Sequence, residues 1–465
     1  MLKAKKKNIA LRLIALGCCS VILAAGWLLL KRLEGEKPAL MLELPSGHLN
    51  LSQTISVTVS DENSGLRRIW IGLVKDKREV VLLDKNFPAT GFSGGGKIHK
   101  ATFKIKIEPK EIGITDGKAI LRMVVRDFSW RKWWRGNRTY IEKDVTIDTK
   151  PPQIDLLTRV HNLSQGGAGL VIFRISEPSI AQGVYVGENY FPGHAGYFKD
   201  PSIIIAFFAL NYKQGPGTKV FVKVTDYAGN VGRTGFPHYF RRKAFKKDVI
   251  KISDRFLNWK MPEFDVETPL DSPTPIDKFL KVNRDIRKAN YRQITRLVVK
   301  TDNINYWDGP FGRLPKSVRR AGFADHRKYK YKGPVIDEQV HLGIDLASVV
   351  HSPVPASNKG KVVFAGSLGI YGKTVLLDHG FGLFSMYAHM SAVNVSEGQI
   401  VAKGEIIGRT GNTGLAGGDH LHFGMLVNDT FVNPVEWWDA AWIKNNITAK
   451  IEAVSDLKRN GSSHK

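Results

Sequence analysis

The chain has 465 residues, a formal net charge of +26 and only two cysteines. This length is too great for one hydrophobic core, so we expect several domains. Because Cys18 and Cys19 both lie near the N-terminus, the rest of the chain has neither disulfides nor thiolate metal ligands. Any metal site there must use histidine and carboxylate side chains.

The first 36 residues predict a membrane anchor. Several basic residues precede a nearly continuous apolar run from Leu13 to Leu30, and two basic residues close it. The run can cross a bilayer as a helix, whereas the apolar core of a cleavable signal is usually shorter. The positive charge lies mainly on the N-terminal side. We therefore predict an uncleaved, single-pass anchor for residues 1–36, with its tail in the cytoplasm and the rest of the chain outside.

The two cysteines suggest lipoprotein processing as an alternative. The order Ala15-Leu-Gly-Cys18 matches a lipobox poorly, however, and the apolar stretch before it is short. Ordinary packing within a membrane helix accounts for both cysteines.

Residues 37–149 and 150–240 predict two tandem Ig-like β-sandwich modules. The run Thr54-Ile-Ser-Val-Thr-Val-Ser60 alternates between polar and apolar residues, as a half-buried strand does. The pattern then repeats: Val57-Thr-Val-Ser-Asp61 resembles Ile172-Phe-Arg-Ile-Ser-Glu177, and Val124-Val-Arg-Asp127 resembles Val222-Lys-Val-Thr-Asp226. We interpret this as an internal duplication. Such modules are usually spacers or binding domains, and protein partners through them remain unknown.

One loop of the first module combines tryptophan with arginine, in the sequence Trp130-Arg-Lys-Trp-Trp-Arg-Gly-Asn-Arg138. Such a loop can stack on sugars, lie at a membrane interface or contact another protein. The simpler alternative is an aromatic patch partly buried within the sandwich.

Residues 241–306 predict a linker with a helix. Thr274-Pro-Ile-Asp277 has a capping threonine and a proline in the first turn. An apolar stripe follows, formed by Ile276, Phe279, Leu280 and Ile286. We expect this helix to pack on the domain that follows; covering a cleft in that domain is the alternative.

Residues 307–445 contain the most informative set. His341-Leu-Gly-Ile-Asp345, Tyr387-Ala-His389 and His420-Leu-His422 place four histidines and one aspartate in one segment of domain size. Zinc takes histidine nitrogen and carboxylate oxygen, and a catalytic zinc keeps one position open for water. Short β runs broken by glycine turns surround the set. His351 and His379 have no partner at a useful spacing, so we interpret both as structural.

The spacing gives part of the geometry. On a strand, His420 and His422 share one face. On a straight strand, His341 and Asp345 would diverge by roughly 13 Å, so they can share an ion only if the chain bends. Gly343 lies midway between them and permits a bend. Spacing alone leaves open which three of the five side chains bind the metal.

Residues from about Trp307 to Asp439 resemble the LytM/lysostaphin-type zinc metallopeptidases, which cleave peptide cross-links in bacterial peptidoglycan. The resemblance covers less than a third of the chain and implies a C-terminal antiparallel β-sheet metallopeptidase domain with the family's duplicated hybrid motif. It rests on Asp337-Glu-Gln-Val-His-Leu-Gly-Ile-Asp-Leu-Ala347, Met386-Tyr-Ala-His389, Gly411-Asn-Thr-Gly414, His420-Leu-His-Phe423 and Asn433-Pro-Val-Glu-Trp437.

The family pattern implies that His341, Asp345 and His422 hold one zinc ion. It also implies that His389 and His420 are catalytic residues outside the metal's ligand set. One departure is Asp419, where many relatives have proline; this changes the local turn or the electrostatics of His420 but removes no required group. All five residues are present, which argues against a non-enzymatic LytM-type regulator that binds the wall and activates an amidase, and against a passive wall-binding module.

The basic charge raises nucleic acid as a partner, because His326-Arg-Lys-Tyr-Lys-Tyr-Lys332 alternates basic and aromatic residues. On a strand, though, Tyr329 and Tyr331 lie on one face and the lysines on the other. With the export signal, this argues against nucleic acid. We expect the charge to attract anionic lipid head groups and the carboxylates of wall peptides.

The sequence as a whole predicts a mostly β protein that acts as a zinc-dependent peptidoglycan endopeptidase. We expect it in the bacterial inner membrane, in contact with lipid through its helix and with peptide stems of the wall through its C-terminal domain. Residues 446–465 are predicted to be a polar tail.

Overall fold

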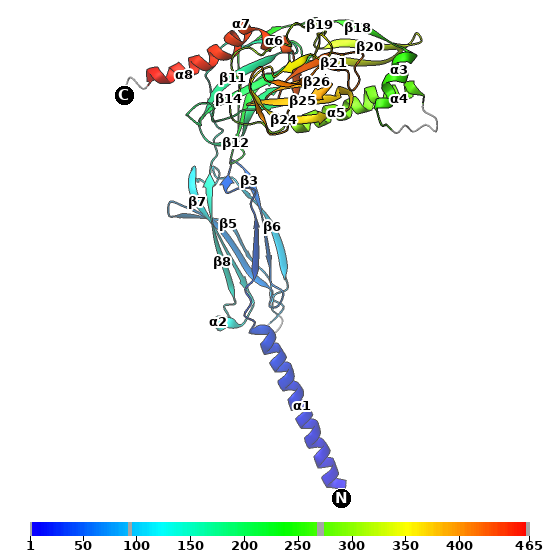
Figure 1. Cartoon of the computed structure of the whole chain (residues 1–465). Helices are drawn as coiled ribbons and strands as arrows, with labels where there is room; N and C mark the ends of the chain where they lie inside the picture. Colours follow the sequence, from blue (N-terminus) through cyan, green and yellow to red (C-terminus); the bar gives the residue numbers. More distant parts are fainter. Residues whose placement is uncertain (1, 92–94, 267–273, 462–465) are drawn as a thin grey trace. The chain divides into compact units, whose positions relative to one another are not determined.

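The computed structural model describes residues 2–91, 95–266 and 274–461. The chain is mostly β, with one long helix at the N-terminus and a β-rich C-terminal domain, as predicted (Figure 1). It divides into two compact units. The first is Met1–Pro151 with Thr225–Asn230, and the second is Pro152–Val224 with Val231–Lys465.

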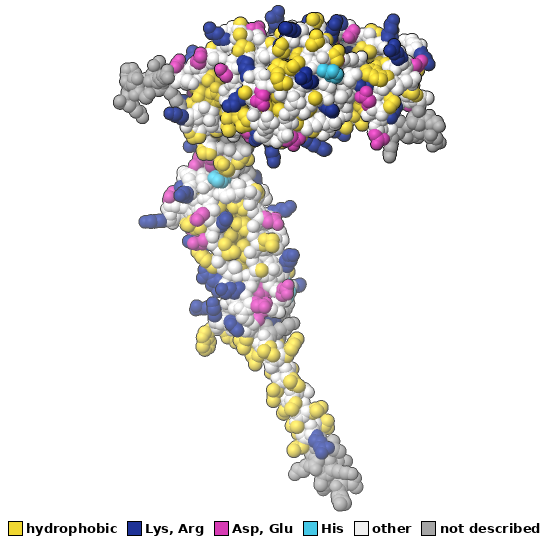
Figure 2. All heavy atoms as spheres, in the orientation of Figure 1, with side chains coloured by type: hydrophobic (Ala, Val, Ile, Leu, Met, Phe, Trp, Pro, Cys, Tyr) yellow, Lys and Arg dark blue, Asp and Glu magenta, His cyan; other side chains and the backbone are white. Residues whose placement is uncertain are grey.

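The helix α1 (Leu2–Arg32) contains the predicted apolar segment. Leu11–Leu30 has a hydropathy of 2.4, and none of it is buried inside the protein. Hydrophobic side chains lie along the helix in Figure 2. Its length and composition therefore fit a single membrane crossing.

The first unit contains a sandwich of two sheets around its own core. The three-stranded sheet has the order β1-β3-β6, formed by Ala39–Glu43, Gln53–Ser60 and Lys100–Ile107. The five-stranded sheet has the order β2-β8-β7-β4-β5, formed by His48–Leu49, Arg138–Ile147, Gly117–Asp127, Leu66–Lys75 and Arg78–Asn86. Burial alternates along β3, where Ile55, Val57 and Val59 face the core. This is the period-2 pattern of a strand with one covered face.

The tryptophan loop forms a short helical turn, α2 (Arg131–Trp134), on the surface of this unit. The side chain of Trp133 is 91% exposed, while the rings of Trp130 and Trp134 lie 5.0 Å apart. The loop is therefore not wholly packed into the sandwich.

The next strands repeat the strand order of the first sandwich. One sheet has the order β9-β11-β14, formed by Ile154–Leu156, Ala168–Ile175 and Ile203–Ala209. The other has the order β13-β12-β15-β16, formed by Asn189–Pro192, Ser179–Val186, Val220–Asp226 and Val231–Gly235. A short pair, β10 (Asn162–Ser164) with β17 (Tyr239–Arg241), accompanies them. The Ig-like assignment and the exact module boundaries stay predictions.

The predicted linker contains a strand as well as helices. β18 (Lys247–Ile252) pairs in parallel with β20 (Asp325–Tyr331), which pairs with β21 (Val335–His341). The helical part comprises α3 (Asp254–Lys260), η1 (Met261–Glu263), α4 (Pro275–Lys281), η2 (Val282–Ile286) and α5 (Arg287–Leu297). The helix start is where the sequence predicts it, because Thr274 and Asp277 form a capping box before Pro275. Phe279 points into the core.

The C-terminal domain is built on an eight-stranded sheet. Its order is β19-β22-β30-β26-β25-β24-β28, with β31 beside β30; the strands are Val318–Ala321, Ile344–Ala347, Leu421–Val427, Leu383–Met390, Lys373–Gly380, Gly360–Ser367, Ile400–Val401 and Thr430–Val432. A smaller sheet has the order β23-β29-β27, formed by Pro353–Pro355, Ile406–Arg409 and Ala392–Val393, and η3 (Gly369–Tyr371) precedes β25. β26 and β30 are buried along their whole length, so both faces are covered.

The described chain ends in four helices, and the last two of them cover residues 446–461 of the predicted polar tail. They are α6 (Pro434–Trp438), α7 (Ala440–Ile443), η4 (Lys444–Thr448) and α8 (Ala449–Gly461). Ile447 and Val454 are buried, and Ile451 packs beside them. These apolar residues recur at helical spacing, a signal that the overall polarity of the segment obscured. Residues 462–465 of the predicted tail lie outside the described residues.

Candidate metal centre

Three strands bring the predicted ligands together. His341 ends β21, Asp345 lies on β22, and His422 lies on β30 directly opposite Asp345 in the strand register. The chain breaks between β21 and β22 at Gly343, as the spacing requires. This glycine does not have a positive φ. It is needed for space, because a Cβ there would lie 2.4 Å from Nε2 of His422.

The three ligand atoms form a closed triangle. His341 Nε2 lies 2.9 Å from Asp345 Oδ1 and 2.9 Å from His422 Nδ1, and the last two atoms are 3.0 Å apart. Hydrogen bonds cannot satisfy all three edges, since each neutral imidazole nitrogen offers one proton or one lone pair. A tetrahedral zinc ion needs donors roughly 3.3 Å apart, close to this spacing, and accepts two nitrogens and one oxygen. The donor set therefore fits zinc.

The other two histidines stand beside this triangle. His420 Nε2 lies 3.6 Å from Asp345 Oδ1. The ring of His389 is centred 4.9 Å from that of His420 and 5.8 Å from that of His422. The structure thus brings together all five residues that the sequence singled out. Their roles as ligand or non-ligand remain predictions.

Backbone carbonyls fix the tautomers of three rings. Nδ1 of His341 contacts Gly322 O at 2.9 Å, Nδ1 of His389 contacts Thr413 O at 2.8 Å, and Nδ1 of His420 contacts Gly418 O at 2.8 Å. A carbonyl only accepts, so Nδ1 carries the proton in each case. Nε2 of the neutral ring is then left with a lone pair.

Sequence reasoning missed Arg327, whose Nη2 donates to Asp345 Oδ2 at 2.9 Å. This bond occupies one carboxylate oxygen and leaves Oδ1 to face the histidines. The signal was the strand alternation, which places Arg327 on the same face of β20 as the buried Tyr329. Lys328 lies between Arg327 and Tyr329 and is exposed on the opposite face of the strand. It belongs to the basic run that resembles a nucleic-acid-binding segment.

Burial and neighbouring charges shift the pKa values of these groups in different directions. Burial opposes ionisation of Asp345, but its close contacts with the imidazoles of His341 and His422 hold its pKa well below the usual range. Burial lowers the pKa of His422 to about 4 and, with the neighbouring histidines, holds that of His389 well below its usual value. Burial lowers the pKa of His420, but the carboxylate of Asp345, 3.6 Å away, raises it by more, so the pKa of His420 is raised overall.

All five side chains line a cavity of about 360 Å³. Its wall also includes Phe256 of α3, Phe279 of α4 and Arg287 of α5, so these helices border the cleft as well as packing on the domain. Tyr371 lines the cavity too, with its ring centred 5.5 Å from that of His422. The five side chains therefore share one cavity with these residues.

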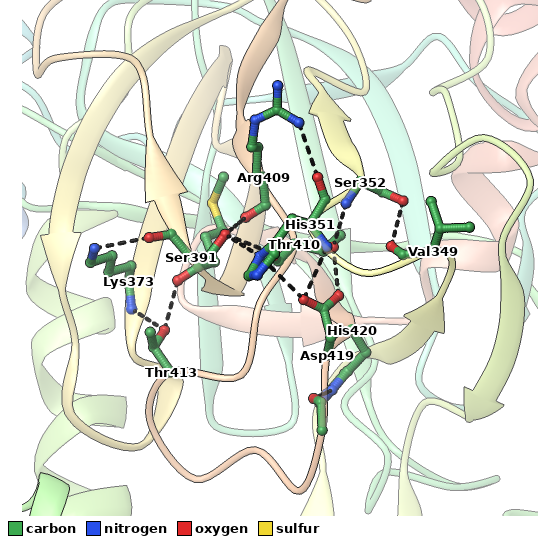
Figure 3. Close-up of polar contacts among 12 residues, drawn as sticks. Val349, His351, Ser352, Lys373, Ser391, Arg409, Thr410, Thr413, Asp419 and His420 are labelled. Carbon is green, nitrogen blue, oxygen red and sulfur yellow. Dashed lines mark hydrogen bonds and ion pairs between the residues drawn. The ribbon is translucent and has the colours of Figure 1, made fainter.

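Asp419, the departure from the family pattern, supports the turn before His420. Figure 3 shows its carboxylate between Thr410 and His351. It accepts hydrogen bonds from Thr410 Oγ1 at 2.6 Å and from the backbone N of His351 at 3.2 Å. These bonds connect the segment before His420 to Thr410, which follows β29, and to His351. Asp419 therefore holds the turn in place.

His351 and His379, which the sequence predicts to be structural, lie outside the cavity lining. His351 contacts Ser391 Oγ through Nδ1 at 3.0 Å. His379 is completely buried and contacts Lys359 O and Ser385 Oγ, each at 2.7 Å. Both therefore have structural contacts, as predicted.

A nitrogen-rich donor triangle, an open cavity and adjacent neutral histidines are the features of a hydrolytic metal centre. Comparison with known proteins names the family: residues 339–434 match the model of Peptidase family M23. The C-terminal part of the chain is therefore an M23 peptidase domain of the LytM/lysostaphin family, as the sequence predicts.

Curated relatives match in the same region. The chain is 43% identical over 97 residues to the DD-carboxypeptidase/endopeptidase Mpg of Neisseria meningitidis serogroup B, a match to 21% of this chain and 22% of that protein. It is 36% identical over 96 residues to the peptidoglycan DD-endopeptidase ShyA of Vibrio cholerae, with shares of 21% and 22%. The chain thus spans only about a fifth of the length of these relatives.

Among solved structures, the catalytic domain of lysostaphin from Staphylococcus simulans is 29% identical, with 28% of this chain and 98% of that domain covered and a TM-score of 0.25.

Proposed function

We propose that this protein is a zinc-dependent endopeptidase that hydrolyses peptide cross-links in bacterial peptidoglycan. The observation that carries the proposal is the closed triangle of His341, Asp345 and His422, with His389 and His420 on the same cavity. The names of the matched relatives support the substrate class.

His341 Nε2, Asp345 Oδ1 and His422 Nδ1 would hold the metal. A zinc ion bound there supplies a Lewis acid for the scissile carbonyl and an acidified water. Arg327 Nη2 donates to Asp345 Oδ2, which leaves Oδ1 as the ligand oxygen. Gly343 gives the ring of His422 the space it needs.

His389 and His420 would move protons. Because their Nδ1 protons are donated to backbone carbonyls, Nε2 of each neutral ring is the available base. The neighbours of His389 disfavour its cationic form, whereas the pKa of His420 is raised by Asp345. His420 is therefore the better candidate to hold a proton and pass it to the leaving amine, and His389 the better candidate for base or neutral hydrogen-bonding partner.

The helix α1 would hold the enzyme in the inner membrane, with its C-terminal domain on the outer side. The wall peptides then lie on the same side as the cavity. Attraction of the +26 chain to anionic lipid and to peptide carboxylates would keep it near both.

Digestion of purified peptidoglycan tests the proposal. The full-length protein in detergent, loaded with zinc, should convert cross-linked muropeptide dimers to monomers and leave the glycan strands intact. Release of whole stem peptides would show an amidase instead, and cut glycan would contradict the reading. If intact protein cleaves nothing but enhances cleavage by an added wall amidase, the regulator alternative is correct.

A further inference from the structure

A second group of acidic side chains meets in the first unit. Glu34 follows α1, Asp61 follows β3, and Asp127 ends β7. One ligand oxygen from each carboxylate lies within 4.8 Å of those of the other two. Asp127 is completely buried and Asp61 is 6% exposed, so two of these acids have little access to bulk water.

Two of these carboxylates have an oxygen without a partner. Asp127 Oδ1 accepts hydrogen bonds from the backbone N atoms of Ser129 and Asn137, at 3.0 and 2.7 Å. Glu34 Oε1 accepts one from Ser64 N at 3.0 Å. The second oxygens, Asp127 Oδ2 and Glu34 Oε2, are buried and have no hydrogen-bond partner among the described residues. Buried carboxylate oxygens rarely stay unsatisfied, because their desolvation is costly.

Burial and mutual repulsion oppose ionisation of the clustered acids. Burial raises the pKa of both Glu34 and Asp127, and the carboxylate of Asp61 raises each of them further. This acidic pocket belongs to a chain with an excess of 26 positive charges, so it stands out from the general composition. The group that it lacks is a cation.

We propose that Glu34, Asp61 and Asp127 bind a calcium ion. The donors are all oxygen, which excludes a preference for zinc and favours a hard cation. Calcium takes six to eight oxygen ligands at about 2.3–2.6 Å in flexible geometry, and backbone carbonyls and water complete such sites. Magnesium demands a near-ideal octahedron and keeps most of its waters, so three clustered carboxylates suit it less well.

The ion would join three segments of the first unit. Ser129 Oγ already donates to Glu34 O at 3.3 Å, and Asn137 Nδ2 donates to the same oxygen at 3.2 Å. Asp127, Ser129 and Asn137 flank the tryptophan loop. The site therefore fixes the stretch that follows the anchor helix against both the loop and the turn at Asp61.

The duplicated sequence supports the choice of these acids. In the second module, Glu177 stands at the position of Asp61 and Asp226 at that of Asp127. Acids at the ends of these two strands are thus part of the module's pattern. Because further calcium could bind elsewhere in the chain, the test must compare variants that differ at one site.

Equilibrium dialysis of the full-length protein in detergent against radioactive calcium tests the proposal. At about 1 mM calcium, in the affinity range of extracellular modules, Asp127→Asn should bind about one calcium fewer per chain than wild type. Glu34→Gln should weaken the same binding at least tenfold. Asp144→Asn, which removes an exposed carboxylate from the same module, should bind as wild type does.

A second readout is the rate at which a protease cuts within residues 32–36. Calcium should slow this cleavage in wild type and in Asp144→Asn, but not in Asp127→Asn or Glu34→Gln. Equal calcium binding by wild type, Asp127→Asn and Glu34→Gln would overturn the proposal, as would the absence of binding in wild type, which would mean that the buried Arg32 or another protein group already neutralises the cluster. If Asp127→Asn fails to fold, Glu34→Gln decides the matter, since its side chain is only partly buried.

Discussion

The first sandwich and the peptidase domain use strands in different ways. In β3 every second residue is buried, whereas β26 and β30 are buried along their whole length. A strand covered on both faces holds its side chains firmly, and His389 and His422 lie on such strands. In the first unit, by contrast, Asp61 follows β3, and Asp127 is the last buried residue of the alternating pattern of β7. Two of the three predicted metal ligands, Asp345 and His422, lie in this eight-stranded sheet, whereas His341 ends β21 in the sheet β18-β20-β21.

The largest expected effect comes from removing one of the three predicted metal ligands. His341→Ala, Asp345→Ala and His422→Ala each leave two protein ligands, so each variant should lose zinc on dialysis and lose cleavage of muropeptide dimers. His48→Ala, in the first module, should keep both. Metal analysis and product chromatography give the two values. Full cleavage by any of the three ligand variants would remove zinc chemistry from this site.

The next effect separates the two histidines of His420-Leu-His422. His420→Ala and His389→Ala should keep close to one zinc per chain while turnover falls by roughly 10²–10⁴-fold, because only proton transfer and transition-state charge are affected. His326→Ala, an exposed histidine of the same domain, serves as the control. Zinc loss in His420→Ala with retention in His422→Ala would reverse the assignment.

Core substitutions compare the two sandwiches directly. Phe207 on β14 is 2% exposed and its ring lies 6.3 Å from that of Trp437, so Phe207→Ala should destabilise the second unit by about 3–5 kcal/mol. Phe103 on β6 is half-buried, and Phe103→Ala should cost the first unit only about 1 kcal/mol. Denaturant unfolding should shift one transition in each variant. If one substitution shifted both transitions, the expectation that the two units unfold separately would be wrong.

The last effect concerns pH. Glu436 Oε2 accepts from Ala168 N at 2.9 Å, and burial raises the pKa of this glutamate from 4.5 to about 7. Between these pH values the folded chain holds a proton that the unfolded chain has lost. The free energy of unfolding of the second unit should therefore fall as pH rises from about 4.5 to about 7, by up to about 3 kcal/mol, and then level off.

Glu436→Gln should abolish this pH dependence, since the amide does not titrate. Glu62→Gln, at an exposed position of the first module, should leave it unchanged. Urea unfolding at several pH values between 4 and 8 measures the effect, and an unaltered slope in Glu436→Gln would assign it to another group.

The sequence predicted the five site residues better than it predicted the residues around them. The five site residues could be chosen because the metal's ligand preferences and the strand period restrict them strongly. Arg327 was missed because a single arginine in a basic run carries no signal until the face of its strand is known. Gly343 lies at the predicted bend, but the room that it provides for His422, a residue far away in the sequence, could not be predicted.

The helices at the end of the chain were harder to predict from the sequence. Residues 446–465 look polar on average, and only the positions of Ile447, Ile451 and Val454 reveal a buried stripe. The start of α4 was predictable because a capping box is a local feature that needs no tertiary contact.

The register between β22 and β30 has a consequence for how the domain assembles. Asp345 and His422 are direct cross-strand partners, and a slip of one residue would put Leu421 opposite Asp345 and turn the ring of His422 to the other face. Only the correctly aligned sheet can present all three donors to one ion. Metal binding would then stabilise only the correctly aligned strands, because its binding energy is available to the native pairing and to no shifted one.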